Sequence, residues 1–389
     1  MNSSFLPLYM KIANDLRMQI HTEKIKPGDK LPTEYEIMQI YNVSRITASK
    51  AVSILAEEGL IYRARKLGTF VKDYNKDDII FSHVDTINTN QKRMFPLVFP
   101  FSMNNGLNIV DGILKSDNTN QYYFVPYNSD NSVENEREIL TNLLSLNPPG
   151  LICNPIVSKK NIPLFMQFKA RKIPLIFIDH GVYGVDAPCV TTDNHAISYN
   201  LTSKLIAMGH TKIASVCTNG TLDTVKARFT GMVKALIENN IIPQEEFFIE
   251  IKHKHKNSAH DLLLSDDPED FDLPAILKTL MSSENRPTAL ICTNDAIAIH
   301  IEKLALASGI SVPKDLSIIG FDNTELCNHM VVPLTSIAQN YEQLGAEAIS
   351  IFNRITVKSP VPSITRVPAK IVWRDSVRNF TNYDVDSYL

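Results

Sequence analysis

A short stretch rich in basic and hydroxyl side chains, Ser44–Lys50, holds the first candidates for chemistry in this 389-residue chain. A guanidinium group can donate two parallel hydrogen bonds to O6 and N7 of guanine, so Arg45 is the first candidate for contact with a nucleic-acid base. Ser49 and Lys50 are weaker candidates for the same contact. Hydroxyl and basic groups suited to phosphate oxygens lie in this stretch and shortly after it: Ser44, Arg65, Lys66 and Thr69.

Three helices and a hairpin are expected to hold these side chains in place. Thr33 and Glu36 form a capping box that starts the second helix, and Ser44 caps the third. One face of the third helix is an apolar stripe of Ala48, Ala51, Val52 and Leu55. The outward face then carries Arg45, Ile46, Ser49, Lys50 and Ser53. With two short strands at 61–65 and 69–72, this order of elements is that of a domain that places one helix in a DNA groove.

Charge is distributed unevenly along the chain. The first 72 residues contain eleven Lys or Arg and seven Asp or Glu, a net charge of +4, whereas the remaining residues carry −7 and the whole chain −3. A basic front favours nonspecific attraction to phosphate, with a strong dependence on salt. A mildly basic, solvated small domain is the alternative, and the caps and the hairpin decide in favour of DNA binding.

The first 72 residues resemble the winged helix-turn-helix of the GntR family of bacterial regulators. The matching words span the domain: Pro7-Leu8-Tyr9, Lys26–Pro32, Val43-Ser44-Arg45, Leu55–Ile61 and Gly68–Val71. The resemblance implies that Arg45 and Thr47 contact DNA. The chain departs from the family at two DNA-contacting positions that are usually Arg, which here are Tyr35 and Ser49. Ile46 is also unusual for the family, and Lys50 is a candidate to compensate.

Beyond this domain, residues 73–93 are predicted to be a polar linker, residues 94–376 a large domain and residues 377–389 a polar tail. The large domain alternates apolar runs with helix-length segments: the runs are Leu97–Phe101, Tyr122–Val125, Gly150–Cys153, Leu175–Ile178, Ile213–Val216, Ala289–Cys292 and Leu316–Gly320. Such alternation predicts parallel strands with helices on both faces, and the number of strands favours two sheets. The expected fold class is therefore α/β, with a winged helix-turn-helix followed by a two-lobed domain of two doubly wound parallel sheets.

Polar side chains directly follow three of these runs, as the pairs Asp179-His180, Asn294-Asp295 and Asp322-Asn323. Ligands of open α/β sheets bind beyond the carboxyl ends of strands, where carboxylates and amides can grip vicinal hydroxyl groups. The alternative is that these residues cap the following helices, which explains Asp295 and Asn323 at least as well. The recurrence at three strand ends favours a common ligand.

The large domain resembles the effector-binding domain of the LacI/GalR family, which is similar to the two-lobed periplasmic sugar-binding proteins. Correspondence is continuous from Thr191 to Gly345 and includes Arg228-Phe229-Thr230-Gly231 and Thr293-Asn294-Asp295. The resemblance implies a lobe 1 at about 94–190 and 340–366 and a lobe 2 at about 191–339 and 367–376. It implies effector contacts from Arg228, Asn294 and Asp322, with weaker matches at Asp179, Ser102 and Gln339. Phe101 or Tyr127 is expected to offer an aromatic face to a sugar ring.

A winged helix of one family joined to an effector domain of the other is similar to the arabinose-responsive repressors built as the same mosaic. The resemblance implies a repressor of carbohydrate-utilisation genes that a monosaccharide, such as a pentose, releases from operator DNA. A homodimer is expected, because one short helix contacts too little DNA to select an operator in a genome. Two alternatives stay open: a sugar- or sugar-phosphate-responsive activator or dual regulator, and, more distantly, an α/β enzyme acting on a small polar substrate.

Other function classes lose support from the absence of their motifs. The sequence has no Walker-type phosphate loop, Gly-x-Gly-x-x-Gly, Gly-x-Ser-x-Gly or His-Glu-x-x-His, so neither enzyme activity nor a cofactor is expected. Without a signal peptide or a run of about 18 apolar residues, a cytoplasmic location is expected. The five dispersed cysteines indicate free thiols. His253, His255 and His260 alternate with lysines, so no metal site is expected.

Overall fold

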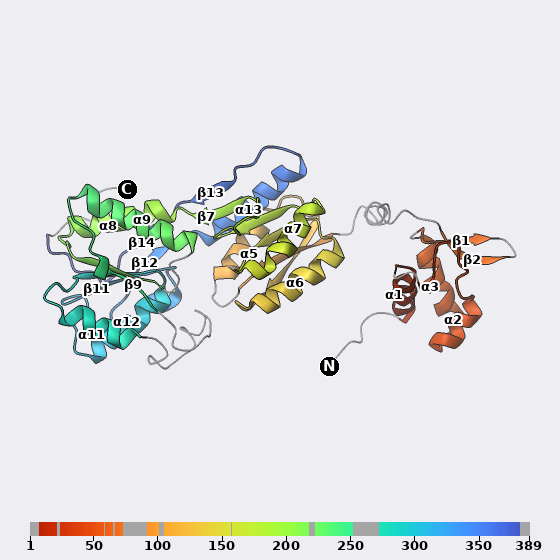
Figure 1. Ribbon diagram of the computed structural model, residues 1–389, viewed down its shortest axis with the longest axis horizontal. Helices are drawn as coiled ribbons and strands as arrows, with labels where there is room; N and C mark the ends of the chain where they lie inside the picture. The colour runs from red at the N-terminus through yellow and green to blue at the C-terminus, as the bar shows by residue number, and fades with distance from the viewer. Residues whose placement is uncertain are drawn as a thin grey trace. The chain divides into compact units, whose positions relative to one another are not determined.

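The computed structural model describes residues 8–21, 24–57, 59–64, 67–72, 92–100, 105–156, 158–217, 222–251 and 272–381. The chain divides into two units, Met1–Gln91 and Lys92–Leu389 (Figure 1). The predicted linker, 73–93, lies outside the described residues except for its last two positions. Within the described ranges, no helix is both long and apolar enough to cross a membrane.

The smaller unit consists of three helices and an antiparallel hairpin. Its elements are α1 (Leu8–His21), α2 (Glu34–Tyr41), α3 (Arg45–Glu57), β1 (Ile61–Ala64) and β2 (Gly68–Val71). Thr33 and Glu36 form the predicted capping box, with Thr33 N donating to Glu36 Oε2 at 2.7 Å. The apolar stripe of α3 packs with α1 in a single buried core. The predicted order of helix, turn, helix and wing is confirmed.

The hairpin has an additional partner that the sequence did not indicate. Leu31 N donates to Thr69 O at 2.8 Å, and Val71 N donates to Asp29 O at 2.9 Å. These bonds join β2 to the segment just before α2. The wing is therefore fixed to the helical core on its inner side.

The first sheet of the larger unit is entirely parallel, with strand order β13-β7-β6-β5-β3-β4. Its strands are β3 (Arg93–Phe99), β4 (Tyr122–Asn128), β5 (Leu151–Cys153), β6 (Leu175–Ile178), β7 (Cys189–Thr192) and β13 (Ile364–Val367). Two helices cover each face: α5 (Asn105–Ser116) with α13 (Tyr341–Thr356), and α6 (Val133–Leu146) with α7 (Ile162–Ala170). The contact between α5 and α13 requires Gly112 and Gly345, because a Cβ at either would lie about 2 Å from a backbone oxygen of the other helix.

The second sheet has strand order β14-β12-β11-β10-β8-β9. Its strands are β8 (Ile213–Cys217), β9 (Phe248–Glu250), β10 (Ala289–Cys292), β11 (Ser317–Phe321), β12 (Thr335–Ala338) and β14 (Lys370–Val372). Helices α8 (Asn194–Ala207) and α9 (Asp223–Glu238) cover one face, and α11 (Leu273–Ser282) and α12 (Asp295–Ala307) the other. The two doubly wound sheets confirm the predicted fold class, with one difference: β14 runs antiparallel to β12.

The chain passes between the two sheets three times. The crossings follow β7, β12 and β13, so lobe 1 contains the described residues between 92 and 192 and between 341 and 367, and lobe 2 contains those between 194 and 338 and between 370 and 381. The ends of β7, β12 and β13 lie near one another where the lobes join, because Thr192 Oγ1 donates to Gln339 Oε1 at 2.5 Å and Asp193 N donates to Val367 O at 2.8 Å. Residues just after these strands belong to the hinge. Side chains at the hinge can contact both lobes.

Part of the predicted polar tail packs on lobe 2. Phe380 N donates to Met208 O at 2.9 Å, and Thr381 Oγ1 donates to Ala207 O at 2.8 Å. The Phe380 ring packs edge-on against the buried ring of His210. The first residues of the predicted polar tail therefore contact the end of α8 through their backbone and aromatic groups.

Candidate functional site

The N-terminal end of α3 presents two highly exposed side chains, one basic and one apolar. The Arg45 side chain is 82% exposed, and Ile46 is also 82% exposed. Ser44 caps the helix, because Thr47 N donates to Ser44 Oγ at 3.3 Å and the two hydroxyls lie 2.9 Å apart. Ser49 is half-buried. Arg45 and Ile46 are thus the predicted residues with the freest access to a DNA groove.

Lys50 is held by the first helix instead of extending freely. Its Nζ lies 4.1 Å from the centre of the Tyr9 ring, a cation–π contact. Glu34 at the start of α2 faces two cations, with 3.9 Å from Oε2 to Arg45 Nε and 3.7 Å from Oε1 to Arg63 Nη2. The Glu34 carboxylate therefore links α2 to the start of α3 and to β1 through two ion pairs.

The wing residues have local structural reasons for their identity. Gly68 has φ of 124°, a backbone conformation that side chains with a Cβ rarely adopt, so glycine is favoured there whether or not DNA binds. Thr69 is half-buried. Tyr35, next to Glu34, is 68% exposed. Arg65 and Lys66 lie outside the described residues.

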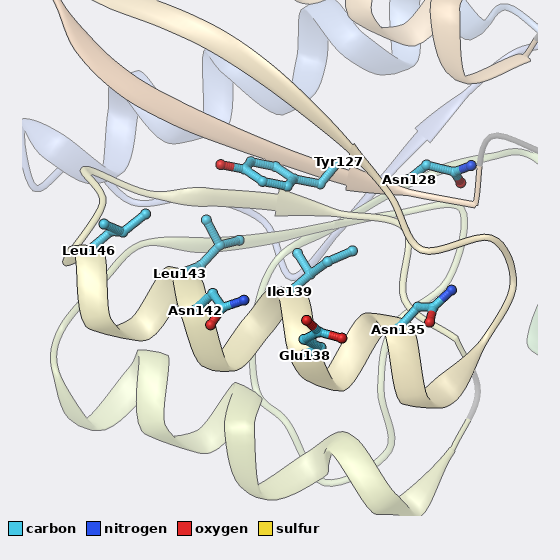
Figure 2. Close-up of a pocket in the computed structure, with 8 residues that line it drawn as sticks. All are labelled: Tyr127, Asn128, Asn135, Glu138, Ile139, Asn142, Leu143 and Leu146. Carbon is cyan, nitrogen blue, oxygen red and sulfur yellow. The ribbon is translucent and has the colours of Figure 1, made fainter. Parts of the chain in front are cut away.

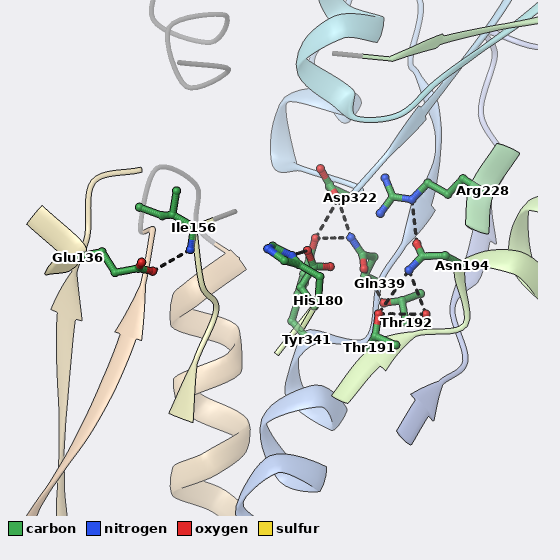
Figure 3. Close-up of polar contacts among 11 residues, drawn as sticks. Glu136, Ile156, His180, Thr191, Thr192, Asn194, Arg228, Asp322, Gln339 and Tyr341 are labelled. Carbon is green, nitrogen blue, oxygen red and sulfur yellow. Dashed lines mark hydrogen bonds and ion pairs between the residues drawn. The ribbon is translucent and has the colours of Figure 1, made fainter. Parts of the chain in front are cut away.

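In the larger unit, polar side chains from both lobes gather where the strands end (Figure 3). Arg228 projects from α9, Asp322 follows β11, Gln339 follows β12 and Tyr341 begins α13. Gln339 Nε2 donates to Asp322 Oδ1 at 2.7 Å, and the Tyr341 hydroxyl donates to the same oxygen at 3.0 Å. Because Tyr341 belongs to lobe 1 and Asp322 to lobe 2, this hydrogen bond links the lobes.

The Arg228 side chain donates two hydrogen bonds and stacks on an aromatic ring. Nε donates to Asn194 Oδ1 at 2.8 Å, Nη1 donates to Thr293 O at 2.5 Å, and the guanidinium carbon lies 3.4 Å from the centre of the Phe321 ring. Burial lowers the pKa of Arg228, while the carboxylates of Asp322 and Asp179 act to raise it. A guanidinium remains charged under these conditions, so Arg228 is a fixed cation of the cluster.

Asp322 is a strained and proton-binding residue. Its φ of 112° is rare for a side chain with a Cβ. Burial and, to a smaller extent, the nearby Asp295 raise its pKa to about 7, against the lowering effect of Arg228 and of the hydrogen bonds from Gln339 and Tyr341. Asp295 itself has a structural task, since Ser336 Oγ and Thr324 N donate to its two oxygens at 2.5 and 2.7 Å. Asp322 is thus the carboxylate whose protonation changes near neutral pH.

Asp179 and His180 belong to lobe 1 and directly follow β6. Asp179 has φ of 71°, and its Oδ2 lies 3.0 Å from His180 Nδ1. Burial acts to raise the pKa of Asp179, yet His180 and Arg228 lower it overall. Burial acts to lower the pKa of His180, yet Asp179 raises it overall. The pair therefore presents a carboxylate that is stabilised by a neighbouring imidazole.

Sequence reasoning overlooked two polar groups that follow other strands of the first sheet. Ser129 Oγ and Asn154 Oδ1 are buried without a hydrogen-bond partner among the described residues, and they directly follow β4 and β5. The strand-end signal that selected Asp179 applies to both. Tyr341 lacks that signal, because it begins a helix and only the fold brings it to Asp322.

Two predicted effector residues have other local roles in the structure. Tyr127 lines a groove of about 310 Å³ between β4 and α6, together with Asn135 and Glu138 (Figure 2). Asn294 caps α12, because its Oδ1 accepts a hydrogen bond from Ile297 N at 2.9 Å. Phe101 and Ser102 lie outside the described residues. Arg228, Asp322, Asp179 and Gln339 are brought together.

The cluster suits recognition of hydroxyl groups by hydrogen bonds. It offers carboxylate acceptors, a guanidinium donor and a hydroxyl that can do both. No group of three or more His, Cys, Asp or Glu side chains within the described ranges could hold a metal ion. All five cysteines are free, and burial raises the pKa of each thiol, so none is poised as a thiolate nucleophile.

Two family models match the chain. Residues 8–71 match the bacterial regulatory proteins of the gntR family, and residues 202–377 match the periplasmic binding protein-like domain. The matches fall on the smaller unit and on the larger one, respectively. They agree with the two resemblances that the sequence motifs indicate.

Similar proteins are regulators of transcription. The chain is 27% identical over 387 residues to the arabinose metabolism transcriptional repressor of Geobacillus stearothermophilus, covering 98% of this chain and 99% of the relative. It is 30% identical over 254 residues to the HTH-type transcriptional repressor PurR of Aliivibrio salmonicida, covering 64% of this chain and 71% of the relative. The solved structure of the transcription regulator CcpA of Lactococcus lactis has a TM-score of 0.63 at 23% identity, covering 74% of this chain and all of that one.

Proposed function

This chain belongs to the bacterial transcriptional repressors that join a GntR-type helix-turn-helix to a periplasmic-binding-protein-like domain, and we propose that a neutral monosaccharide, arabinose or a related pentose, releases it from its operator. The chain is a DNA-binding regulator and not an enzyme. Arabinose is the first candidate effector because the Geobacillus relative is an arabinose metabolism repressor. Its place of action would be the cytoplasm, where operator DNA is found.

The observation that carries the proposal is the polar cluster shared by both lobes. Lobe 1 contributes Asp179 and Tyr341, and lobe 2 contributes Arg228 and Asp322. Sugar hydroxyls both donate and accept hydrogen bonds, so a sugar can replace the bonds that Gln339 and Tyr341 now give to Asp322. A ligand that contacts both lobes favours whichever arrangement of the lobes it fits best.

The charges of the cluster favour a neutral sugar over a phosphorylated one. Arg228 already gives Nε and Nη1 to Asn194 and Thr293, and Asp179 holds His180. The carboxylates of Asp179 and Asp322 would repel a phosphate dianion at short range. A neutral polyol meets no such repulsion.

We infer that DNA release follows from a change in the distance between the two winged helix-turn-helix units of a homodimer. In a homodimer bound to a palindrome, Arg45 and Ile46 of each copy would enter the major groove, while Tyr35, Ser44 and Thr69 would contact the phosphate backbone. An effector that alters lobe closure in both copies would change the distance between the two α3 helices. Coupling of this kind is commonly about 1–3 kcal/mol, or roughly 5- to 150-fold in affinity.

Fluorescence anisotropy of an operator duplex, selected from a random library with the full chain, tests this function. L-Arabinose, ribose, xylose and arabinose 5-phosphate are titrated at fixed salt, because salt alone changes DNA affinity strongly. We expect one neutral pentose to weaken operator binding by roughly 5- to 150-fold. The phosphate ester should have a much smaller effect.

Two results would contradict the proposal. Operator affinity that no neutral sugar changes would remove the effector assignment, and tighter operator binding with sugar would reverse the sign of regulation. Thermal unfolding in the presence of each sugar provides a check that does not involve DNA, because a ligand of the folded state raises the unfolding temperature. Sedimentation of the protein on the operator reports whether two copies bind.

A further inference from the structure

An apolar side chain stands at a highly exposed position of the helix that is proposed to contact the bases of DNA. Ile46 is 82% exposed in the first turn of α3, beside the equally exposed side chain of Arg45. Single exposed apolar residues are common on protein surfaces, so exposure by itself has no meaning. The position of Ile46 is significant, because the N-terminal residues of a recognition helix face the base edges in the major groove.

The neighbours of Ile46 leave few other side chains for base contact. Ala48 is buried, Thr47 and Ser49 are half-buried, and Lys50 is held over the ring of Tyr9. Among the first six residues of α3, Arg45 and Ile46 therefore form the part of the surface with the freest approach to bases. A short polar side chain such as Ser49 reaches less far than either.

The chemistry of the groove decides what Ile46 can read. The 5-methyl group of thymine is the one apolar group that the four standard bases present in the major groove, and a guanidinium pairs best with O6 and N7 of guanine. Consecutive residues of a helix lie 1.5 Å apart along its axis, so their side chains reach the same or adjacent base pairs. The β-branched side chain of Ile46 has few rotamers, so little freedom is lost on contact.

We propose that Ile46 reads the 5-methyl group of a thymine next to the guanine that Arg45 contacts. The inference rests on the proposed function, in which the start of α3 enters the major groove. It names the composition of the operator half-site, a guanine with a neighbouring thymine. Arg45 provides the polar half of that recognition, and Ile46 provides the apolar half.

Uracil substitution in the operator tests the contact directly. The full chain first selects its preferred site from a random duplex library. Binding is then measured by anisotropy at fixed salt, to that site and to copies in which single thymines are replaced by uracil. Uracil pairs as thymine does and lacks only the methyl group. We expect one thymine in each half-site, adjacent to guanine, to cost about four-fold in affinity when replaced, as expected for the burial of one methyl group.

Variants assign the methyl dependence to a side chain. Ile46→Ala should bind the thymine and uracil duplexes equally well, and Ile46→Val should keep most of the difference. Ile40→Ala is the matched control, because Ile40 is an isoleucine 63% exposed near the end of α2, and this variant should keep the full difference.

The outcomes separate this inference from the proposed function. A selected operator that tolerates uracil at every thymine, or an Ile46→Ala protein that keeps the methyl dependence, overturns the inference and leaves the function standing. Selection that enriches no sequence at all overturns both. Methyl dependence that Ile46→Ala abolishes and Ile40→Ala retains establishes the contact.

Discussion

The two arginines at the centres of the two sites are held in opposite ways. Arg45 has a side chain that is 82% exposed, with only a 3.9 Å contact to Glu34, whereas Arg228 donates two hydrogen bonds and stacks on Phe321. DNA is a large and rigid polyanion that supplies partners from outside, so its contact residues can remain in solvent. A small ligand is enclosed, so its site must satisfy its own charges when empty. The same substitution should therefore act differently at the two positions.

The largest effect is expected from Arg228→Ala. The change leaves Asn194 Oδ1 and Thr293 O without their donor, and leaves the carboxylates of Asp179 and Asp322 without their cation. Breaking such a buried charge network costs about 3–5 kcal/mol, so thermal unfolding of the larger unit should occur at a lower temperature. Sugar should no longer change operator binding.

Lys234→Ala is the control for that experiment. Lys234 lies on the same helix, α9, and its exposed ammonium is 3.9 Å from Glu238, an i,i+4 pair. Exposed pairs of this kind contribute about 0.3–0.5 kcal/mol. If Arg228→Ala were as mild as Lys234→Ala in both stability and sugar response, the difference between the enclosed site and the exposed one would be lost.

Arg45→Ala should affect binding and leave folding intact. The Arg45 side chain is exposed, so its removal should change the free energy of unfolding by no more than about 0.5 kcal/mol, as for other surface substitutions. Loss of a bidentate contact with guanine should weaken binding to the selected operator by about 1–3 kcal/mol. Anisotropy against the selected operator and against random duplex DNA separates the two kinds of contact. Equal weakening on both duplexes would mean that Arg45 contacts phosphate.

The pH dependence of stability should distinguish the enclosed site further. The pKa of Asp322 is raised from its ordinary value to about 7 in the folded protein, so the folded state binds a proton more tightly than the unfolded chain. The stability gained from that proton is present at low pH and is lost as the pH rises through 7. His180, whose pKa is also raised, acts in the same direction.

Asp322→Asn isolates the contribution of the carboxyl group. Between pH 5 and 8, unfolding temperatures of the wild-type protein without sugar should decline more steeply than those of the variant. Equal slopes would place the titration elsewhere. Operator binding should show little change over the same range, because the guanidinium of Arg45 stays charged throughout.

Caps and motif words predicted most of the architecture, because they act locally. Thr33 and Glu36 stand three residues apart and form their box without help from the rest of the chain. The strand-end rule found Asp179 and Asp322 for a similar reason, since a polar residue after a buried strand must lie at the edge of a sheet. Ser129 and Asn154 obey the same rule, since each directly follows a strand of the first sheet.

Contacts that depend on the placement of distant segments could not be found in this way. Asn294 has the composition of a ligand, yet its oxygen is used by the cap of α12, a choice between two local roles that the sequence left open. Tyr127 has an aromatic face, but it points into the groove against α6, because side chains alternate along β4. Lys50 meets Tyr9 only because α1 packs on α3.

Tyr341→Phe is expected to give the smallest effect and the sharpest view of the link between the lobes. The change removes one hydroxyl, which donates to Asp322 at 3.0 Å and accepts from Gln339 Nε2 at 3.0 Å, while Gln339 still donates to the same oxygen of Asp322. A single hydrogen bond contributes about 0.5–1.5 kcal/mol, so the unfolding temperature should fall by only a few degrees. Tyr122→Phe is the control, since the Tyr122 hydroxyl has no hydrogen bond within the described part of the chain and its ring packs in the core of lobe 1. Calorimetry of sugar binding then decides what the bond does: because the sugar has to replace it, Tyr341→Phe should bind the pentose no more weakly than the wild-type protein. A marked loss of sugar affinity would instead make the Tyr341 hydroxyl a direct contact of the effector.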